Sequence, residues 1–256
     1  MTGRRVTAAT LIVAVPAAAA LLLVLDRSPD PTPAPERGPS AQSPQQASPV
    51  APARARPRAG GTVGAHVLRR VQLRERPGGR VVQTLGRRTG YDSKRVLAVV
   101  ARRPGWLGVL SDHMPNSRAG WIPAAAATLR FEPYTLHVDL SEREIVVRRG
   151  RHAVRRIAVA VGRAGSRTPI GRFAITDALP MAHLRSAYGC CALALTGRQP
   201  NLPQGWSGGD RLAIHGTESK ATIGTPATAG CLRASNRDMR WLMARSLLGA
   251  TVRIRA

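Results

Sequence analysis

The chain has 256 residues, of which 43% are hydrophobic, enough for two small globular domains or one large one. Its formal net charge of +25 either attracts a polyanion, namely nucleic acid, anionic lipid or an anionic wall polymer, or reflects a bias toward arginine without a specific partner. Aromatic residues make up only 4%, and nucleic-acid-binding surfaces interleave aromatic with basic residues, so the composition argues against a nucleic-acid partner.

The first predicted element is an apolar N-terminal segment. The run Thr7–Leu25 carries no charge, and two arginines precede it. A run of this length can span a bilayer, and arginines before it are typical of a cytoplasmic N-terminus. We therefore expect residues 1–26 to be a single-pass anchor in the cell membrane, with the remaining chain outside the cytoplasm. The alternative is a cleaved signal peptide, although the run ends without a small-x-small cleavage site.

Two further segments follow the anchor. Residues 27–60 are rich in Pro, Ala, Ser, Gln and Arg, which cannot bury a core and predict an extended linker. Residues 61–130 hold short strand-like runs at a spacing that predicts a small β-barrel, namely Val67–Leu73, Val81–Leu85, Val96–Val100, Trp106–Leu110 and Gly120–Pro123. The segments Leu73–Gly78, Gly105-Trp106 and Gly120–Ile122 resemble bacterial SH3-like domains. The resemblance implies a module that binds wall peptides or only spaces a catalytic domain, and both roles stay open.

Residues 131–256 are predicted to be mainly β with one clear helix. Strands are expected at Leu136–Leu140, Glu144–Val147, Ala153–Val161 and Val252–Ile254. Apolar residues at helical spacing predict a helix from Asn236 to Leu248. Ser235 would cap this helix, Asp238 would complete a capping box, and Gly249 would end it.

The candidate chemistry lies in Ile214-His215-Gly216-Thr217 and Thr228-Ala229-Gly230-Cys231, where one histidine stands sixteen residues ahead of one cysteine. A cysteine becomes a good nucleophile when a neighbour lowers its pKa or accepts its proton, and histidine does both. We therefore predict that Cys231 is the nucleophile and His215 its base. Cys190 and Cys191 are adjacent, a spacing that rarely allows a relaxed disulfide, so we expect each to be a small buried hydrophobe.

These motifs stand in the order found in L,D-transpeptidase catalytic domains of the YkuD type, and the chain resembles them at Val161-Gly162, Thr168–Phe173, Tyr188-Gly189, Ile214–Thr217, Gly230–Arg233 and Gly249–Val252. The resemblance implies a YkuD-type β-sandwich over 131–256 that transfers acyl groups on peptidoglycan stem peptides, with no metal or cofactor. Cys231 would attack the carbonyl of the third stem residue, D-Ala would leave, and a side-chain amine of a second stem would attack the thioester. Carbapenem-type β-lactams would acylate the same thiol.

The resemblance also implies roles for the residues around the pair. The Gly216 carbonyl would orient the imidazole, as a third group does in catalytic triads. Backbone N–H groups of Gly230 and Cys231 could hold the developing oxyanion. Ala229 departs from the His or Arg that the family usually has before its Gly-Cys, which leaves acceptor preference and rate open.

Three side chains are candidates for substrate contacts. Arg233 would pair with a carboxylate of the stem peptide or favour the thiolate, or it would form an internal salt bridge. Tyr188 would flank the donor site or only pack. Thr228 is a further candidate for substrate binding.

Other interpretations compete with transpeptidation. A zinc site could combine His183, His215, Cys190 and Cys231, but these residues lack the paired spacing of structural zinc sites. A wall-binding protein without activity would not require an intact histidine and cysteine. Hydrolysis of the same acyl-enzyme by water cannot be separated from transfer in the sequence.

Overall fold

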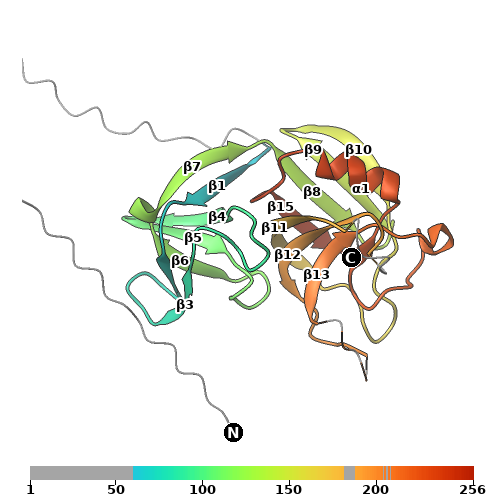
Figure 1. Ribbon diagram of the computed structural model, residues 1–256, viewed down its shortest axis with the longest axis horizontal. Helices are drawn as coiled ribbons and strands as arrows, with labels where there is room; N and C mark the ends of the chain where they lie inside the picture. The colour runs from blue at the N-terminus through green and yellow to red at the C-terminus, as the bar shows by residue number, and fades with distance from the viewer. Residues whose placement is uncertain (1–59, 182–187, 204, 206, 208) are drawn as a thin grey trace, which may run out of the picture. The chain divides into compact units, whose positions relative to one another are not determined.

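The computed structural model describes residues 60–181, 188–203, 205, 207 and 209–256, and these residues are mainly β with one α-helix. The strands form two sheets, one within residues 62–132 and one within residues 134–255 (Figure 1). Both sheets belong to the compact unit Pro52–Ala256. The predicted anchor, and the linker up to residue 59, lie outside the described residues. Within the described part, every helix is too short or too polar to cross a bilayer.

The first sheet has seven strands in the order β3-β2-β6-β5-β4-β1-β7, and the paired neighbours run antiparallel. Its strands are β1 (Thr62–Val67), β2 (Val71–Arg74), β3 (Val81–Leu85), β4 (Val96–Arg103), β5 (Trp106–Leu110), β6 (Ala119–Pro123) and β7 (Ala127–Glu132). Side chains alternate along a strand, and the inward set forms a core around Leu73, Leu97 and Ile122. The similarity of this part to SH3-like domains stays a prediction.

The predicted strands of this part agree with the structure except at its start. The run Val81–Leu85 is β3 and the run Trp106–Leu110 is β5, as predicted. A single strand over Val67–Leu73 is wrong, because β1 ends at Val67 and β2 begins at Val71. The turn between them contains Leu68, which is 54% exposed, so an apolar residue in solvent was counted as part of a buried strand.

The second sheet has eight strands in the order β10-β9-β8-β15-β11-β12-β13-β14. They are β8 (Tyr134–Asp139), β9 (Glu144–Arg149), β10 (His152–Ala158), β11 (Gly171–Pro180), β12 (Cys191–Arg198), β13 (Arg211–His215), β14 (Leu232–Arg233) and β15 (Thr251–Arg255). The pairs β8–β15 and β13–β14 are parallel. The expected hairpin and closing strand are present as β8, β9 and β15, whereas the expected strand Ala153–Val161 ends at Ala158.

Strand β11 joins the two halves of this sheet. Its first residues, Gly171–Ala174, pair with β15, and the residues from Ile175 onward pair with β12. The register shifts between Ile175 and Asp177, where an irregularity bends a strand. The strands β12, β13 and β14 therefore extend the sheet from the second half of β11.

The helix α1 (Asn236–Met243) packs on β12 and buries Met239 and Leu242. Ser235 caps it as predicted, because its Oγ accepts the Asp238 N–H at 3.0 Å. The predicted end at Leu248 is wrong. The Arg245 N–H donates to the Leu242 carbonyl three residues back, which tightens the last turn and ends the helical path.

Candidate active site

His215 is the last residue of β13, and the chain around it fixes the state of its ring. Its Nδ1 lies 2.7 Å from the carbonyl oxygen of Gly216, and a carbonyl only accepts, so Nδ1 carries the proton. The side chain is buried, and this burial lowers the pKa of His215 to about 4, against the opposing effect of the Gly216 hydrogen bond. At neutral pH the ring is therefore uncharged, with Nε2 as the nitrogen that can accept a proton.

Cys231 immediately precedes β14, and its thiol is also uncharged at neutral pH. Burial raises the pKa of Cys231, while a backbone hydrogen bond at Ala213 and the charge of Arg233 oppose the rise. The sulfur lies 3.8 Å from the carbonyl oxygen of Arg211. Among the described residues no hydrogen bond joins this thiol to the imidazole, which is common for catalytic pairs without substrate.

The structure brings His215 and Cys231 to one pocket of about 60 Å³. The rest of its lining is Tyr188, Gln199, Leu202, Gly209–Arg211, Thr228, Ala229 and Arg233. A larger hollow of about 470 Å³ lies on β8, β9 and β15, but its lining contains no cysteine.

The turn before Cys231 is held by hydroxyl groups. Thr228 is buried, its Oγ1 donates to the Cys231 carbonyl at 2.7 Å, and the same oxygen accepts the Gly230 N–H at 3.0 Å. Thr168 donates to the Gly230 carbonyl at 2.8 Å. The hydroxyl of Thr228, predicted to bind substrate, is thus used inside the turn. The Gly230 N–H, predicted as an oxyanion donor, is likewise already engaged.

Arg233 lines the pocket without a carboxylate partner. The structure shows no salt bridge to Arg233 within the described residues, and its buried Nε has no hydrogen-bond partner there. Of the roles considered for this residue, an internal salt bridge is therefore absent from the described part. A buried guanidinium nitrogen without a partner is costly unless a ligand satisfies it.

Tyr188 lies against the catalytic histidine candidate. The ring centroids of Tyr188 and His215 are 4.8 Å apart with an interplanar angle of 63°, an edge-to-face contact. Burial, followed by the proximity of Cys231, raises the pKa of the phenol. Both predicted roles, packing and flanking the donor site, are compatible with this position.

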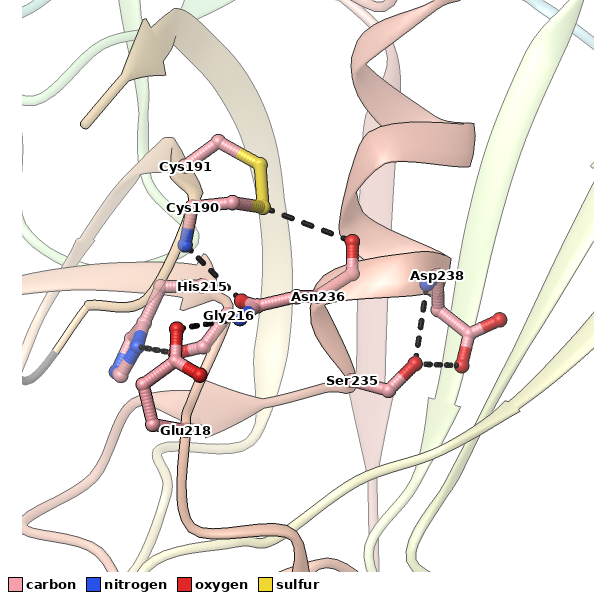
Figure 2. Close-up of a disulfide and its surroundings, with 8 residues drawn as sticks. All are labelled: Cys190, Cys191, His215, Gly216, Glu218, Ser235, Asn236 and Asp238. Atoms are coloured by element: carbon pink, nitrogen blue, oxygen red, sulfur yellow. Dashed lines mark hydrogen bonds between the residues drawn. A yellow bond between two sulfur atoms is a disulfide. The ribbon is translucent and has the colours of Figure 1, made fainter. Parts of the chain in front are cut away.

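Cys190 and Cys191 form a disulfide at the start of β12 (Figure 2). The prediction that each is a separate buried thiol is wrong, although Cys191 is buried in the core of the second sheet as expected. The zinc alternative loses a ligand, because the Cys190 sulfur is bonded to carbon and sulfur and cannot act as a thiolate. Its other candidate ligand, His183, lies outside the described residues.

Gln199 is one residue of the site that sequence reasoning missed. It is buried, and its Nε2 lies 3.0–3.1 Å from the carbonyl oxygens of Ser166, Arg167 and Ala229. A glutamine at the end of a strand carries no motif, so nothing in the sequence distinguished it from a surface residue.

Arg211 was also missed. Its carbonyl contacts the thiol, and its guanidinium forms a 2.9 Å ion pair with Asp112, which lies between β5 and β6. It also donates to Thr176 at 2.8 Å. These contacts join residues far apart in sequence, which no local pattern predicts.

Comparisons with known proteins point to one family. The sequence model described as the L,D-transpeptidase catalytic domain, YkuD, matches residues 133–254. A Bacillus licheniformis protein named as a candidate L,D-transpeptidase, YkuD, is 28% identical over 107 residues. That match covers 42% of this chain and 56% of the relative, so the chain spans about half the length of the curated protein it matches.

Solved structures of L,D-transpeptidases also align with the chain at low similarity. One from Mycobacterium smegmatis has a TM-score of 0.41 and 11% identity, covering 64% of this chain and 92% of that one. L,D-transpeptidase 3 from Mycobacterium tuberculosis, in complex with a faropenem-derived adduct, has a TM-score of 0.37 and 13% identity, covering 54% and 73%. By the match of the family's sequence model, residues 133–254 are similar to L,D-transpeptidase catalytic domains of the YkuD type.

Proposed function

We propose that the protein is a peptidoglycan L,D-transpeptidase, an acyltransferase that uses Cys231 as its nucleophile. The observation that carries the proposal is the pocket lined by both Cys231 and His215, whose Nδ1 proton is held by the Gly216 carbonyl. The similarity of residues 133–254 to this family's sequence model supports the choice of reaction and substrate.

The first half of the reaction forms a thioester. His215 Nε2 takes the proton from Cys231 Sγ as the sulfur attacks the carbonyl carbon of the third stem residue. The bond from that carbon to the nitrogen of D-Ala breaks, and the imidazolium returns the proton to the departing amine. Because both groups are uncharged at rest, proton transfer accompanies attack instead of preceding it.

The second half transfers the acyl group to an amine. A side-chain amine of another stem peptide attacks the thioester, His215 accepts its proton, and the carbon–sulfur bond breaks to regenerate the thiol. The products are a new amide cross-link and the free enzyme. Water in place of the amine would give hydrolysis, with the same acyl-enzyme.

Charge that develops on the carbonyl oxygen needs hydrogen-bond donors. Within the described part of the chain no hydrogen bond engages the Cys231 N–H, whereas the Gly230 N–H would first have to leave Thr228. Arg233 offers a buried Nε that no other described residue hydrogen-bonds, and this nitrogen suits a carboxylate of the stem peptide. We assign it to substrate binding on this ground.

Carbapenem-type β-lactams are proposed covalent inhibitors. Opening of the lactam by Cys231 forms a thioester like that of the first half-reaction, and the amine that would leave stays tethered to the acyl group. As in the first half-reaction, His215 passes the thiol proton to the nitrogen whose bond to the carbonyl carbon breaks, here the ring nitrogen of the lactam.

The rest of the chain is proposed to place this chemistry at the wall. Thr7–Leu25 would anchor the protein in the cell membrane, residues 27–60 would act as a tether, and residues 61–130 would form an SH3-like module that binds or spaces. This arrangement predicts that the protein purified from its host keeps Met1 or Thr2 and partitions with membranes, whereas an N-terminus near Asp26 would indicate cleavage.

The assay uses a purified disaccharide-tetrapeptide and mass spectrometry of the products. Loss of D-Ala with formation of a cross-linked dimer is expected for the wild type and not for the Cys231→Ala variant. Detection of the tripeptide monomer without the dimer would indicate hydrolysis. Binding to purified sacculi without turnover would instead support a wall-binding protein, and equal product from both proteins would contradict the proposal.

A further inference from the structure

The backbone after His215 lies against the loop before β12 at unusually close range. A Cβ on Gly216 would come closer than 3.0 Å to Asn236 Oδ1, and a Cβ on Gly189 would come equally close to that oxygen and to the Gly216 carbonyl carbon. Only glycine fits at these two positions, because any side chain there would collide with the Asn236 amide. Figure 2 shows Asn236 between the Cys190–Cys191 disulfide and the Gly216 segment.

Asn236 uses its amide to connect these two segments. Its Oδ1 accepts the Cys190 N–H at 3.0 Å, and its Nδ2 donates to Glu218 Oε1 at 2.7 Å (Figure 2). The same two segments are also joined directly through the backbone, because the Gly216 N–H donates to the Cys191 carbonyl at 3.0 Å. Gly216, whose carbonyl accepts from His215, is thus held at its N–H by the Cys191 carbonyl and has the Asn236 amide packed against its Cα.

The position of Asn236 is itself well determined. It is the first residue of α1, and the helix cap is provided by Ser235, not by Asn236. The Asp238 carboxylate accepts from Ser235 Oγ at 2.6 Å and from Arg155 at 2.6 and 3.0 Å. The Cys190 sulfur adds a 3.6 Å contact with the Asn236 carbonyl oxygen. The side-chain amide of Asn236 is therefore not used to cap the helix.

We propose that Asn236 is a positioning residue for the His215 base. It holds the Gly216 peptide so that the carbonyl accepts from Nδ1 and leaves Nε2 to take the thiol proton. This rests on the proposed function of His215. Loss of the amide donor would let the Gly216 carbonyl turn away, so the Nδ1–H tautomer and the reactivity of Cys231 would fall together.

The variant Asn236→Asp isolates this role. It keeps an acceptor for the Cys190 N–H and places an acid near a helix N-terminus, where it is tolerated or favourable. It removes the donor to Glu218 and sets two carboxylates face to face, which raises the pKa of one of them. Protonation of that pair at acidic pH restores a shared hydrogen bond, while His215, with a pKa of about 4, stays neutral at pH 5.5.

The rescue variant reverses the hydrogen bond. In the double variant Asn236→Asp with Glu218→Gln, the glutamine amide donates to the new carboxylate. Glu218→Gln alone keeps the oxygen that accepts from Asn236 and is expected to behave as wild type. Asn201→Asp is the matched control, because Asn201 is exposed and its side chain has no hydrogen bond among those of the described residues.

Two measurements are made on each variant of the full chain. The first is the rate of Cys231 acylation by a carbapenem, followed by intact mass at pH 7.5 and 5.5. The second is the tautomer of His215, read from long-range proton–nitrogen NMR spectra of histidine-labelled protein and assigned with a His215→Asn variant. Melting temperatures are recorded alongside.

We expect Asn236→Asp to lower the acylation rate about 10- to 100-fold at pH 7.5, with less loss at pH 5.5 and little change in melting temperature. The Nδ1–H signal of His215 should weaken in parallel, and the double variant should regain both. An unchanged rate and tautomer, or a loss that follows the melting temperature and is not rescued, would overturn the proposal. If wild type itself is not acylated, the proposed function fails, and the NMR signal alone decides on Asn236.

Discussion

Replacing Gly230 with alanine tests how the turn before Cys231 is built. Gly230 has φ of +128°, which L-residues rarely adopt, and a Cβ there would lie under 3.0 Å from Gln199 Nε2. The backbone strain costs about 1–3 kcal/mol. Displacing the buried Gln199 amide leaves up to three carbonyls without their donor. This loss lowers the free energy of unfolding by a further ~1–3 kcal/mol. We expect Gly230→Ala to lower the free energy of unfolding by about 2–6 kcal/mol.

A double-mutant cycle separates the two costs. Gln199→Ala alone removes the same hydrogen bonds and should cost about 1–3 kcal/mol. Adding Gln199→Ala to Gly230→Ala should then cost little more, because the amide has already been displaced and the clash disappears. The coupling free energy between the two sites is therefore expected to be about 1–3 kcal/mol in size, with the double variant more stable than additivity predicts.

Urea denaturation of the four proteins, followed by tryptophan fluorescence, gives the free energies and their slopes. Equal slopes are needed so that the differences reflect stability alone. Additive effects of the two substitutions would refute the reasoning, because they would mean that Gln199 and Gly230 do not constrain each other. A fully tolerated Gly230→Ala would refute it more directly.

The chemistry of the cysteines and of Arg233 gives three more expected outcomes. Because burial raises the pKa of Cys231 and lowers that of His215, the alkylation rate of native Cys231 by iodoacetamide should rise steadily above neutral pH; a plateau from acidic to neutral pH would instead indicate a thiolate–imidazolium pair. Alkylation of the denatured, unreduced protein should label Cys231 and neither partner of the Cys190–Cys191 disulfide, and a label on either partner would contradict that bond. Arg233→Gln should raise the KM for tetrapeptide by about tenfold or more with little change in stability, and an unchanged KM would contradict a role in substrate binding.

The sequence predicted the elements that follow a strong local pattern. Strand β3, strand β5 and the start of α1 agree with the structure because each is marked by residues within the element, such as the Ser235 cap. The end of α1 was placed five residues too late. Leu247 is buried although it lies beyond the helix. An apolar residue at helical spacing was therefore not evidence that its backbone is helical.

The candidate site was predictable only where a residue type itself implies chemistry. His215, Cys231 and the Gly216 carbonyl could be assigned roles in advance, and the structure brings them together. Whether those roles are exercised stays a prediction. Asn236 and Gln199 could not be found, because their hydrogen-bond partners are distant in sequence and an amide side chain has no distinctive spacing. The Cys190–Cys191 disulfide was missed because adjacency argued for two separate side chains.

The spacing of His215 and Cys231 has a physical explanation in the pairing of β13 with β14. Parallel strands cannot be joined by a tight hairpin, and the sixteen-residue separation provides the connection that such a pairing requires. His215 pairs with Arg233, and side chains alternate along a strand, so Cys231, two residues before Arg233, is directed to the same face. The three side chains accordingly line one pocket.

This register gives a prediction in which no site residue is substituted. One alanine inserted between Cys231 and Leu232 would move the thiol to the opposite face while β13 and β14 keep their pairing. Acylation of Cys231 by a carbapenem, measured by intact mass, should then be lost. The same insertion between Lys220 and Ala221, which are exposed in the connecting segment, should be tolerated, because a longer loop costs little and leaves the register unchanged. If both insertions acylate at the wild-type rate, the strand register does not determine where the thiol lies, and the link between this fold and its proposed chemistry would have to be sought in the loop alone.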